Sequence, residues 1–141
     1  MTKTLSSRKA PFAFQLDLAS GVPVYRQLID QVQAGIASGW LATGDQLPTV
    51  RQVAVDLAIN PNTVLRAYRE LEIRGVLETQ QGTGTFIAEK PVPQDEVERE
   101  RQFDQLARDV VAKAGAAGFK VSELVERLKE FAREADGKKR R

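Results

Sequence analysis

The apolar residues of this chain follow helical spacing over most of its length. Between residues 24 and 38 they recur every three or four positions and form one stripe, which predicts an amphipathic helix. The same spacing predicts two short helices over 49–58 and 60–74. It also predicts two longer helices, at about 95–113 and from Ser122, which we expect to cap its helix, to about residue 136.

Alternation of apolar and polar residues is confined to short segments. Residues 12–18 alternate and predict a short strand or an extended arm that lays apolar side chains on the domain. Residues 76–79 and 85–87 predict two strands joined by a turn over 80–84, whose glycines suit a hairpin. Residues 46–48 are expected to be extended, because a residue that precedes proline is pushed away from the helical region.

Capping residues define the junction between the two short helices. Thr49 and Gln52 have the spacing of a capping box, in which each side chain bonds the other residue's backbone N–H. Asn60 is an expected N-cap and Pro61 suits the first helical position. Ala58, where the first helix ends, and Ile59 are the only residues between the two helices, which predicts a helix-turn-helix.

The second short helix is followed directly by the hairpin. Gly75 suits the left-handed position that ends a helix, and Gly82 and Gly84 lie in the hairpin turn. The predicted fold class is mainly α with a small β-wing: an N-terminal winged helix-turn-helix and a short C-terminal two-helix unit. Such a fold places one helix in the DNA major groove and the hairpin against the backbone or minor groove.

The domain organisation follows from polar stretches and proline. We expect a flexible tail over 1–11, the winged helix-turn-helix over 12–90, a two-helix dimerisation region over 91–136 and a basic tail over 137–141, of which 138–141 should be disordered. The boundary falls at Pro91-Val92-Pro93, a stiff break in the pattern.

Composition excludes several classes of protein. The 141 residues contain neither Cys nor His, which removes thiolate metal sites and the commonest general base and transition-metal ligand. We therefore expect no enzyme activity, no metal and no cofactor. No apolar run approaches the ~20 residues of a membrane helix, and the first ten residues lack the apolar stretch of a signal peptide. We expect a soluble, cytoplasmic protein without disulfides.

Charge weakly opposes nucleic-acid binding. The whole chain carries a net charge of +2, but residues 24–90 hold six cationic and seven acidic side chains. Affinity for phosphate must then come from arginines gathered on one face, because counterion release depends on local contacts.

Five separated motifs together resemble the GntR family of bacterial transcription regulators, YtrA-type subfamily. They occur in the family's order and are Pro23-Val24-Tyr25, Leu47–Arg51, Asn60–Tyr68, Leu71-Glu72 and Gly82–Phe86. The resemblance implies a homodimeric repressor that binds a palindromic operator in double-stranded DNA, and family members often control transporter operons. The C-terminal helices resemble the small dimerisation unit of YtrA-type members, since about fifty residues leave no room for a large effector domain.

The candidate DNA contacts lie in the two helices and the wing. Arg51 and Arg66 are expected to touch base edges or phosphates, although each could be a solvated surface arginine. Asn60 could equally be a simple N-cap, whereas Tyr68 is expected in the core. Arg69 and Arg74 are expected to form mostly surface ion pairs. The set of expected contacts is Arg51, Asn60, Pro61, Asn62, Thr63, Arg66, Gly82, Thr83 and Gly84.

The wing departs from the family pattern, in which basic residues commonly precede the glycines. Here Gln80 and Gln81 stand in those positions. We expect the wing to hold phosphate through glycine and threonine backbone amides and amide side chains, with a smaller dependence on salt.

The apolar stripes of the last two helices are expected to form the dimer interface. So many exposed aliphatic residues usually need a partner, although a small satellite core would also explain them. The expected dimerisation residues are Phe103, Leu106, Val110, Leu124, Val125, Leu128 and Phe131. A small-molecule effector could bind between these helices and the DNA-binding domains, but no residue identifies one. The alternative function is a winged-helix protein-interaction module without sequence-specific DNA binding.

Overall fold

The computed structural model describes residues 12–89 and 95–140, with side chains as far as Asp136. The chain divides into two compact units, one built mainly from the residues up to Lys90 and the other from Pro91–Glu134. The expected tail over 1–11, the boundary at Pro91 and the final Arg141 lie outside the described residues.

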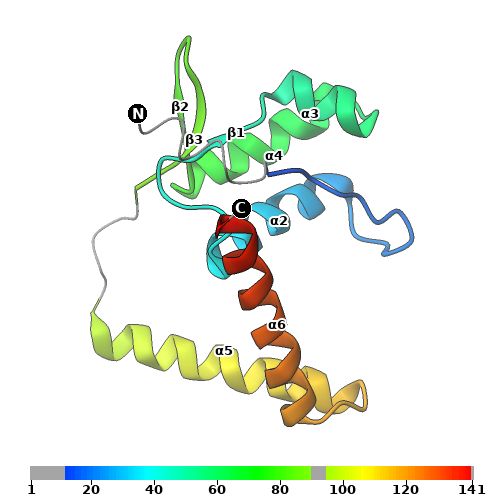
Figure 1. Cartoon of the computed structure of the whole chain (residues 1–141), viewed down its shortest axis with the longest axis vertical. Coiled ribbons are helices and arrows are strands. Elements are labelled where there is room, and N and C mark those ends of the chain that lie inside the picture. Colours follow the sequence, from blue (N-terminus) through cyan, green and yellow to red (C-terminus); the bar gives the residue numbers. More distant parts are fainter. Residues whose placement is uncertain (1–11, 90–94, 141) are drawn as a thin grey trace. The chain divides into compact units, whose positions relative to one another are not determined.

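Residues 12–89, the main described part of the first unit, form three helices and a small antiparallel sheet. The helices are α2 (Val24–Ser38), α3 (Val50–Leu57) and α4 (Pro61–Ile73), as predicted. Strands β2 (Leu77–Gln80) and β3 (Gly84–Ile87) form the predicted hairpin, which extends beyond the helices (Figure 1). A third strand, β1 (Gln46–Leu47), pairs with the other edge of β3, so the strand order is β1-β3-β2. The sequence had indicated only an extended segment there.

The core of this unit lies between α2, α4 and the sheet. Its fully buried side chains come from the predicted stripes of the two helices, and α3 adds Val53 and Ala54. The sheet contributes Leu47, Leu77 and Ile87, one from each strand. The five largest fully buried side chains are Leu28, Ile29, Val32, Val64 and Leu71.

Residues before α2 form an extended arm rather than a strand. Phe14 is buried against the core, and Phe12 and Leu16 are partly buried beside it. Two glutamines one turn apart on α2 hold the arm. The Gln27 amide bonds the N–H and C=O of Asp17, and the Gln31 amide bonds those of Gln15. Two glutamines one helical turn apart on α2 thus bond two residues that are two positions apart in the extended arm.

Local capping follows the prediction in part. The Thr49 hydroxyl accepts the Gln52 N–H at 3.0 Å, but the Gln52 side chain bonds Asp56 instead of returning to Thr49, so only half of the predicted capping box forms. At the end of α4, Gly75 has φ 78° as expected. The N–H groups of Gly75 and Val76 bond the carbonyls of Glu72 and Leu71, which is a Schellman motif.

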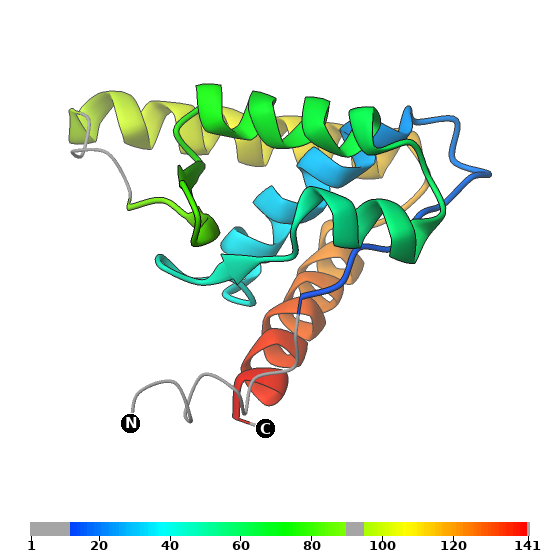
Figure 2. The same cartoon turned by 90° about the horizontal axis from the view of Figure 1, so that it is seen from above.

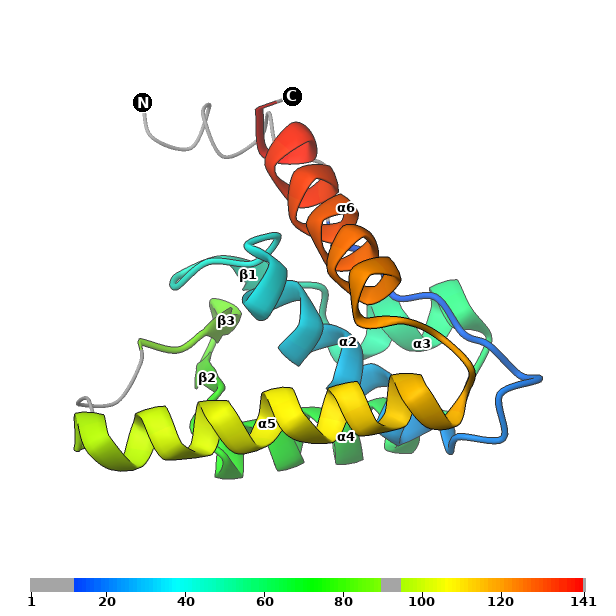
Figure 3. The same ribbon diagram turned by 90° about the horizontal axis from the view of Figure 1, so that it is seen from below.

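The described part of the second unit contains the long helix α5 (Glu96–Ala116) and most of α6 (Val121–Arg140), as far as Glu134. The two helices diverge from a short connection (Figure 3). Ser122 lies inside α6, so its predicted capping role is wrong. The Glu123 carboxylate instead accepts the Lys120 N–H, the reciprocal half of a capping box. The backbone of α6 stays helical to Arg140, so this helix continues into the predicted basic tail.

Candidate nucleic-acid interface

A tight turn joins α3 to α4 (Figure 2). Ala58 adopts a left-handed conformation with φ 55°, and its N–H bonds the carbonyls of Ala54 and Val55. The Asn60 side-chain oxygen accepts the Asn62 N–H at 2.8 Å, so the N-cap interpretation of Asn60 is confirmed. A contact between Asn60 and DNA stays a prediction, because capping employs one of its side-chain groups only.

Helix α4 presents one polar face from its N-terminal half. Asn62 and Arg66 are exposed and Thr63 is half-buried, whereas Val64, Ala67 and Tyr68 are buried on the opposite side. The N-terminal part of such a helix is the part that enters a major groove. The candidate contacts on α4 therefore lie together on an accessible face backed by the core.

Tyr68 belongs to the core, as expected. Its hydroxyl donates a 2.6 Å hydrogen bond to the Pro48 carbonyl, which attaches the segment before α3 to α4. Burial raises the pKa of the Tyr68 hydroxyl well above its ordinary range. The hydroxyl is therefore a structural donor and not a group that meets DNA.

The arginines of this unit have different surroundings. The guanidinium carbon of Arg66 lies 3.8 Å from the centre of the Tyr25 ring on α2. Arg74 instead pairs with Glu70 at 3.0 Å, as the prediction of surface ion pairs required. Arg51 is exposed in the first turn of α3, one residue after its start. Arg51 and Arg66 therefore present their charge at the helix-turn-helix, whereas the charge of Arg74 is paired with Glu70.

Gln46, a residue that the sequence did not single out, contacts the wing. The Gln46 amide on β1 donates to the Thr83 carbonyl at 3.1 Å. The same amide group would be crowded by a Cβ on Gly84, but it ends a flexible side chain that could shift, so the φ of 138° is the stronger reason for glycine there. The motif Gly82–Phe86 was visible, but nothing in the sequence indicated that β1 lies against it.

One of the wing amides expected to hold phosphate already has a partner within the turn. The Thr83 N–H donates to the Gln80 carbonyl at 3.0 Å and closes the turn, with Gly82 at φ 80°. That amide therefore does not point to a phosphate. The Thr83 hydroxyl, on an exposed residue at the tip, is the group through which Thr83 would meet a phosphate.

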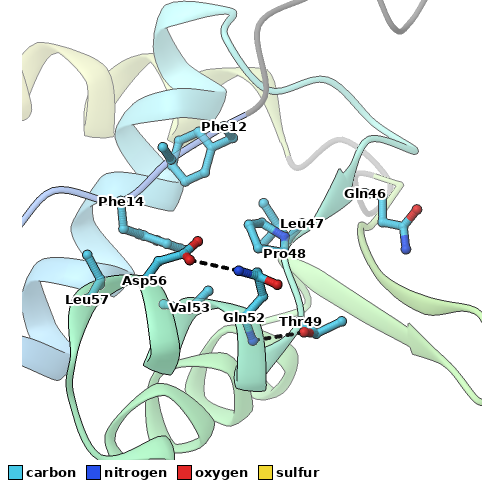
Figure 4. A pocket seen from close by; sticks show the side chains of 11 residues that line it. Phe12, Phe14, Gln46, Leu47, Pro48, Thr49, Gln52, Val53, Asp56 and Leu57 are labelled. Carbon is cyan, nitrogen blue, oxygen red and sulfur yellow. Dashed lines mark hydrogen bonds between the residues drawn. The ribbon is translucent and has the colours of Figure 1, made fainter.

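An open cavity of about 580 Å³ lies between the arm and α3 (Figure 4). Phe12, Phe14, Leu47 and Val53 give it an apolar lining, and its one ionisable lining residue, Asp56, bonds Gln52 at 2.7 Å. The lining offers no pair of groups for acid–base chemistry. Within the described ranges, no group of three or more acidic, His or Cys residues could hold a metal ion.

The predicted dimerisation residues are exposed in the second unit. Phe103 is 65% exposed and Leu128 and Phe131 are each 51% exposed. Leu106 and Val125 are also exposed, and Val110 and Leu124 are half-buried. No residue within Glu96–Ala116 is buried. As far as the chain is described, none of its helices has the length and apolar character needed to cross a bilayer.

A helix-turn-helix with an exposed second helix, followed by a hairpin wing, defines the chain as a winged-helix DNA-binding regulator. Residues 24–87 match the family described as bacterial regulatory proteins, gntR family. The HTH-type transcriptional repressor YtrA of Bacillus subtilis is 34% identical over 126 residues, 89% of this chain and 97% of the relative. The uncharacterized HTH-type transcriptional regulator YhcF of the same organism is 39% identical over 116 residues, 79% and 92% of the two chains. The chain therefore belongs to the GntR family of transcription regulators.

Solved structures agree with this family. YtrA from Sulfolobus acidocaldarius, a GntR-family transcription factor, has a TM-score of 0.52 and 30% identity and covers 74% of this chain and 99% of its own. A transcriptional antiterminator from Listeria monocytogenes has a TM-score of 0.65 and 25% identity, with 89% and 94% covered. The resemblance noted from five motifs is thus confirmed.

Proposed function

We propose that this regulator is a homodimeric repressor that binds a palindromic operator in the cytoplasm. The observation that carries the proposal is the exposed face of α4, on which Asn62, Thr63 and Arg66 stand over a fully buried core. The relative from Bacillus subtilis that matches nearly the whole chain is named a repressor, which favours repression over activation.

The proposed contacts divide by their chemistry. Arg66 and Asn62 have side chains suited to base edges, since Arg bonds guanine and Asn bonds adenine in the major groove. Arg51, Thr63 and the Thr83 hydroxyl are suited to phosphate or base contacts at the margins of the groove. Asn60, Pro61, Gly82 and Gly84 shape the helix start and the wing so that backbone can approach DNA closely.

Dimerisation is proposed through α5 and α6. The apolar side chains of both helices are largely exposed, and a second copy of the same unit would cover them. A two-fold dimer places its two recognition helices on half-sites about one helical turn apart, roughly 34 Å. The operator is therefore expected to be palindromic.

The experiment is selection of operators from random duplexes by the full-length protein. A palindromic consensus supports the proposal, and it supplies candidate promoters, among which a transporter operon is expected from the family resemblance. Repeating the selection with Arg66→Ala should remove the preference at particular base pairs, at a loss of ~1–3 kcal/mol. Arg74→Ala removes the same charge from a residue already paired with Glu70 and is the matched control.

One result would contradict the proposal and another would change the role of Arg66 within it. No enrichment at low salt would favour a protein-interaction module, or binding that requires an effector. Uniform weakening of Arg66→Ala on all sequences would mean that Arg66 touches only phosphate. The existence of an effector stays a prediction. If dialysed protein and protein in cell extract bind the operator with equal affinity, there is no reason to expect an effector.

A further inference from the structure

We propose that Tyr25 is a positioning residue, which holds the Arg66 guanidinium in the orientation that reads a guanine. This inference rests on the proposed function of Arg66 as a base contact. Tyr25 does not itself touch DNA in the proposal. It acts through Arg66, from a different helix.

The geometry of the pair is the first observation. Tyr25 is the second residue of α2, and Arg66 is the sixth of α4. The Arg66 guanidinium lies over the Tyr25 ring, with its carbon 3.8 Å from the ring centre, which is well inside the range of a cation–π interaction. The side chains of two residues 41 positions apart are therefore in contact between α2 and α4.

The Tyr25 ring is a rigid support. It is half-buried and packs against the core cluster, whereas Arg66 is exposed. A free arginine side chain has many rotamers, and ordering them when DNA binds lowers the affinity. A guanidinium that already rests on a fixed ring loses less rotamer freedom on binding.

Stacking leaves the hydrogen-bonding edge of Arg66 available. The N–H groups of a guanidinium point outward in its plane, so a ring that lies against the central carbon leaves the outer edge of the group open to hydrogen bonds. Among the described residues, no hydrogen bond or ion pair engages those N–H groups. Arg74 is the contrast, because Glu70 and Gln33 accept hydrogen bonds from its guanidinium. Arg66 can therefore stack on Tyr25 and bond guanine O6 and N7 at the same time.

The test is a double-mutant cycle on the selected operator and on operators changed one base pair at a time. Tyr25→Leu removes the ring, Tyr25→Phe keeps it, and each is made with Arg66 and with Arg66→Ala. Tyr25→Leu should weaken operator binding about fivefold, the size of an exposed cation–π interaction. The loss should be confined to the base pairs that Arg66→Ala also affects. Tyr25→Phe should bind within about twofold of the wild type, since a phenyl ring still supports the cation.

The cycle separates positioning from general destabilisation. In the Arg66→Ala background, Tyr25→Leu should cause no further loss. An equal loss in both backgrounds, or a loss spread evenly over all base pairs, would overturn the inference while leaving Arg66 as a base contact. If Arg66→Ala itself changes no base preference, the proposed function of Arg66 fails and this inference fails with it. Thermal unfolding of each variant establishes that the fold is retained, and Tyr25→Met replaces Tyr25→Leu if the latter unfolds.

Discussion

The winged-helix unit and the two-helix unit use their apolar residues in opposite ways. In the first, α2, α4 and the sheet enclose side chains such as Leu28, Val64 and Leu71, which are fully buried. In the second, Phe103, Leu128 and Phe131 are half or more exposed, although the apolar residues there also recur at helical spacing. Periodicity alone therefore shows that a helix has an apolar face, and the surroundings decide whether the same chain covers it.

The difference has a functional consequence. A site that must present side chains at fixed positions needs a closed core beneath it, because packed interiors resist deformation. The face of α4 has such a core. The open faces of α5 and α6 instead suit association, since covering them with another chain removes apolar surface from water.

The largest effect is expected from Leu71→Ala. Leu71 is fully buried, so its truncation should lower the free energy of unfolding by ~2–5 kcal/mol, through lost burial and a residual cavity. Chemical denaturation monitored by the fluorescence of Trp40 measures this. The matched change Leu128→Ala should leave that transition nearly unchanged, because Leu128 is half-exposed. Equal destabilisation by both would mean that the two units do not differ as described.

Leu128→Glu should act on association instead of folding. We expect a dimer dissociation constant raised about a hundredfold, or roughly 2.7 kcal/mol, because each subunit would bury an unpaired charge at the interface. Sedimentation equilibrium measures the shift towards monomer, and operator affinity should fall with it. Ser122→Glu adds the same charge at an exposed polar position of α6 and should leave the dimer intact. A Leu128→Glu protein that sediments like the wild type would exclude this face as the interface.

Tyr68→Phe should have the smallest effect and one that depends on pH. Near neutral pH the variant should lose ~1 kcal/mol of unfolding free energy, the worth of the hydrogen bond to Pro48. Burial raises the pKa of the Tyr68 hydroxyl in the folded state, so this contribution is fully present below about pH 10 and is lost as pH rises further, when the unfolded tyrosine ionises. The difference in unfolding free energy between wild type and variant should therefore become smaller above about pH 10. Chemical denaturation at several pH values measures it. If this difference grows above about pH 10, the Tyr68 hydroxyl is not buried as described.

Much of the fold could be predicted, because helix ends are set by neighbouring residues. Asn60 caps α4 through an N–H two residues away. At the other end, the N–H groups of Gly75 and Val76 bond carbonyls three and five residues before them. Where two local solutions compete, prediction failed: Gln52 bonds Asp56 instead of completing the capping box, and Glu123, not Ser122, serves the start of α6.

The sequence by itself determined the helices, the hairpin, the helix-turn-helix and the family, since each depends on short-range pattern or on motif order. Only the tertiary structure decided how distant residues meet. It added β1 to the wing sheet, set the Gln46 amide against Gly84 and placed the Tyr25 ring beneath Arg66. The physical reason is that side-chain contacts across the core depend on how the elements pack, and periodicity along one element carries no information about its neighbour.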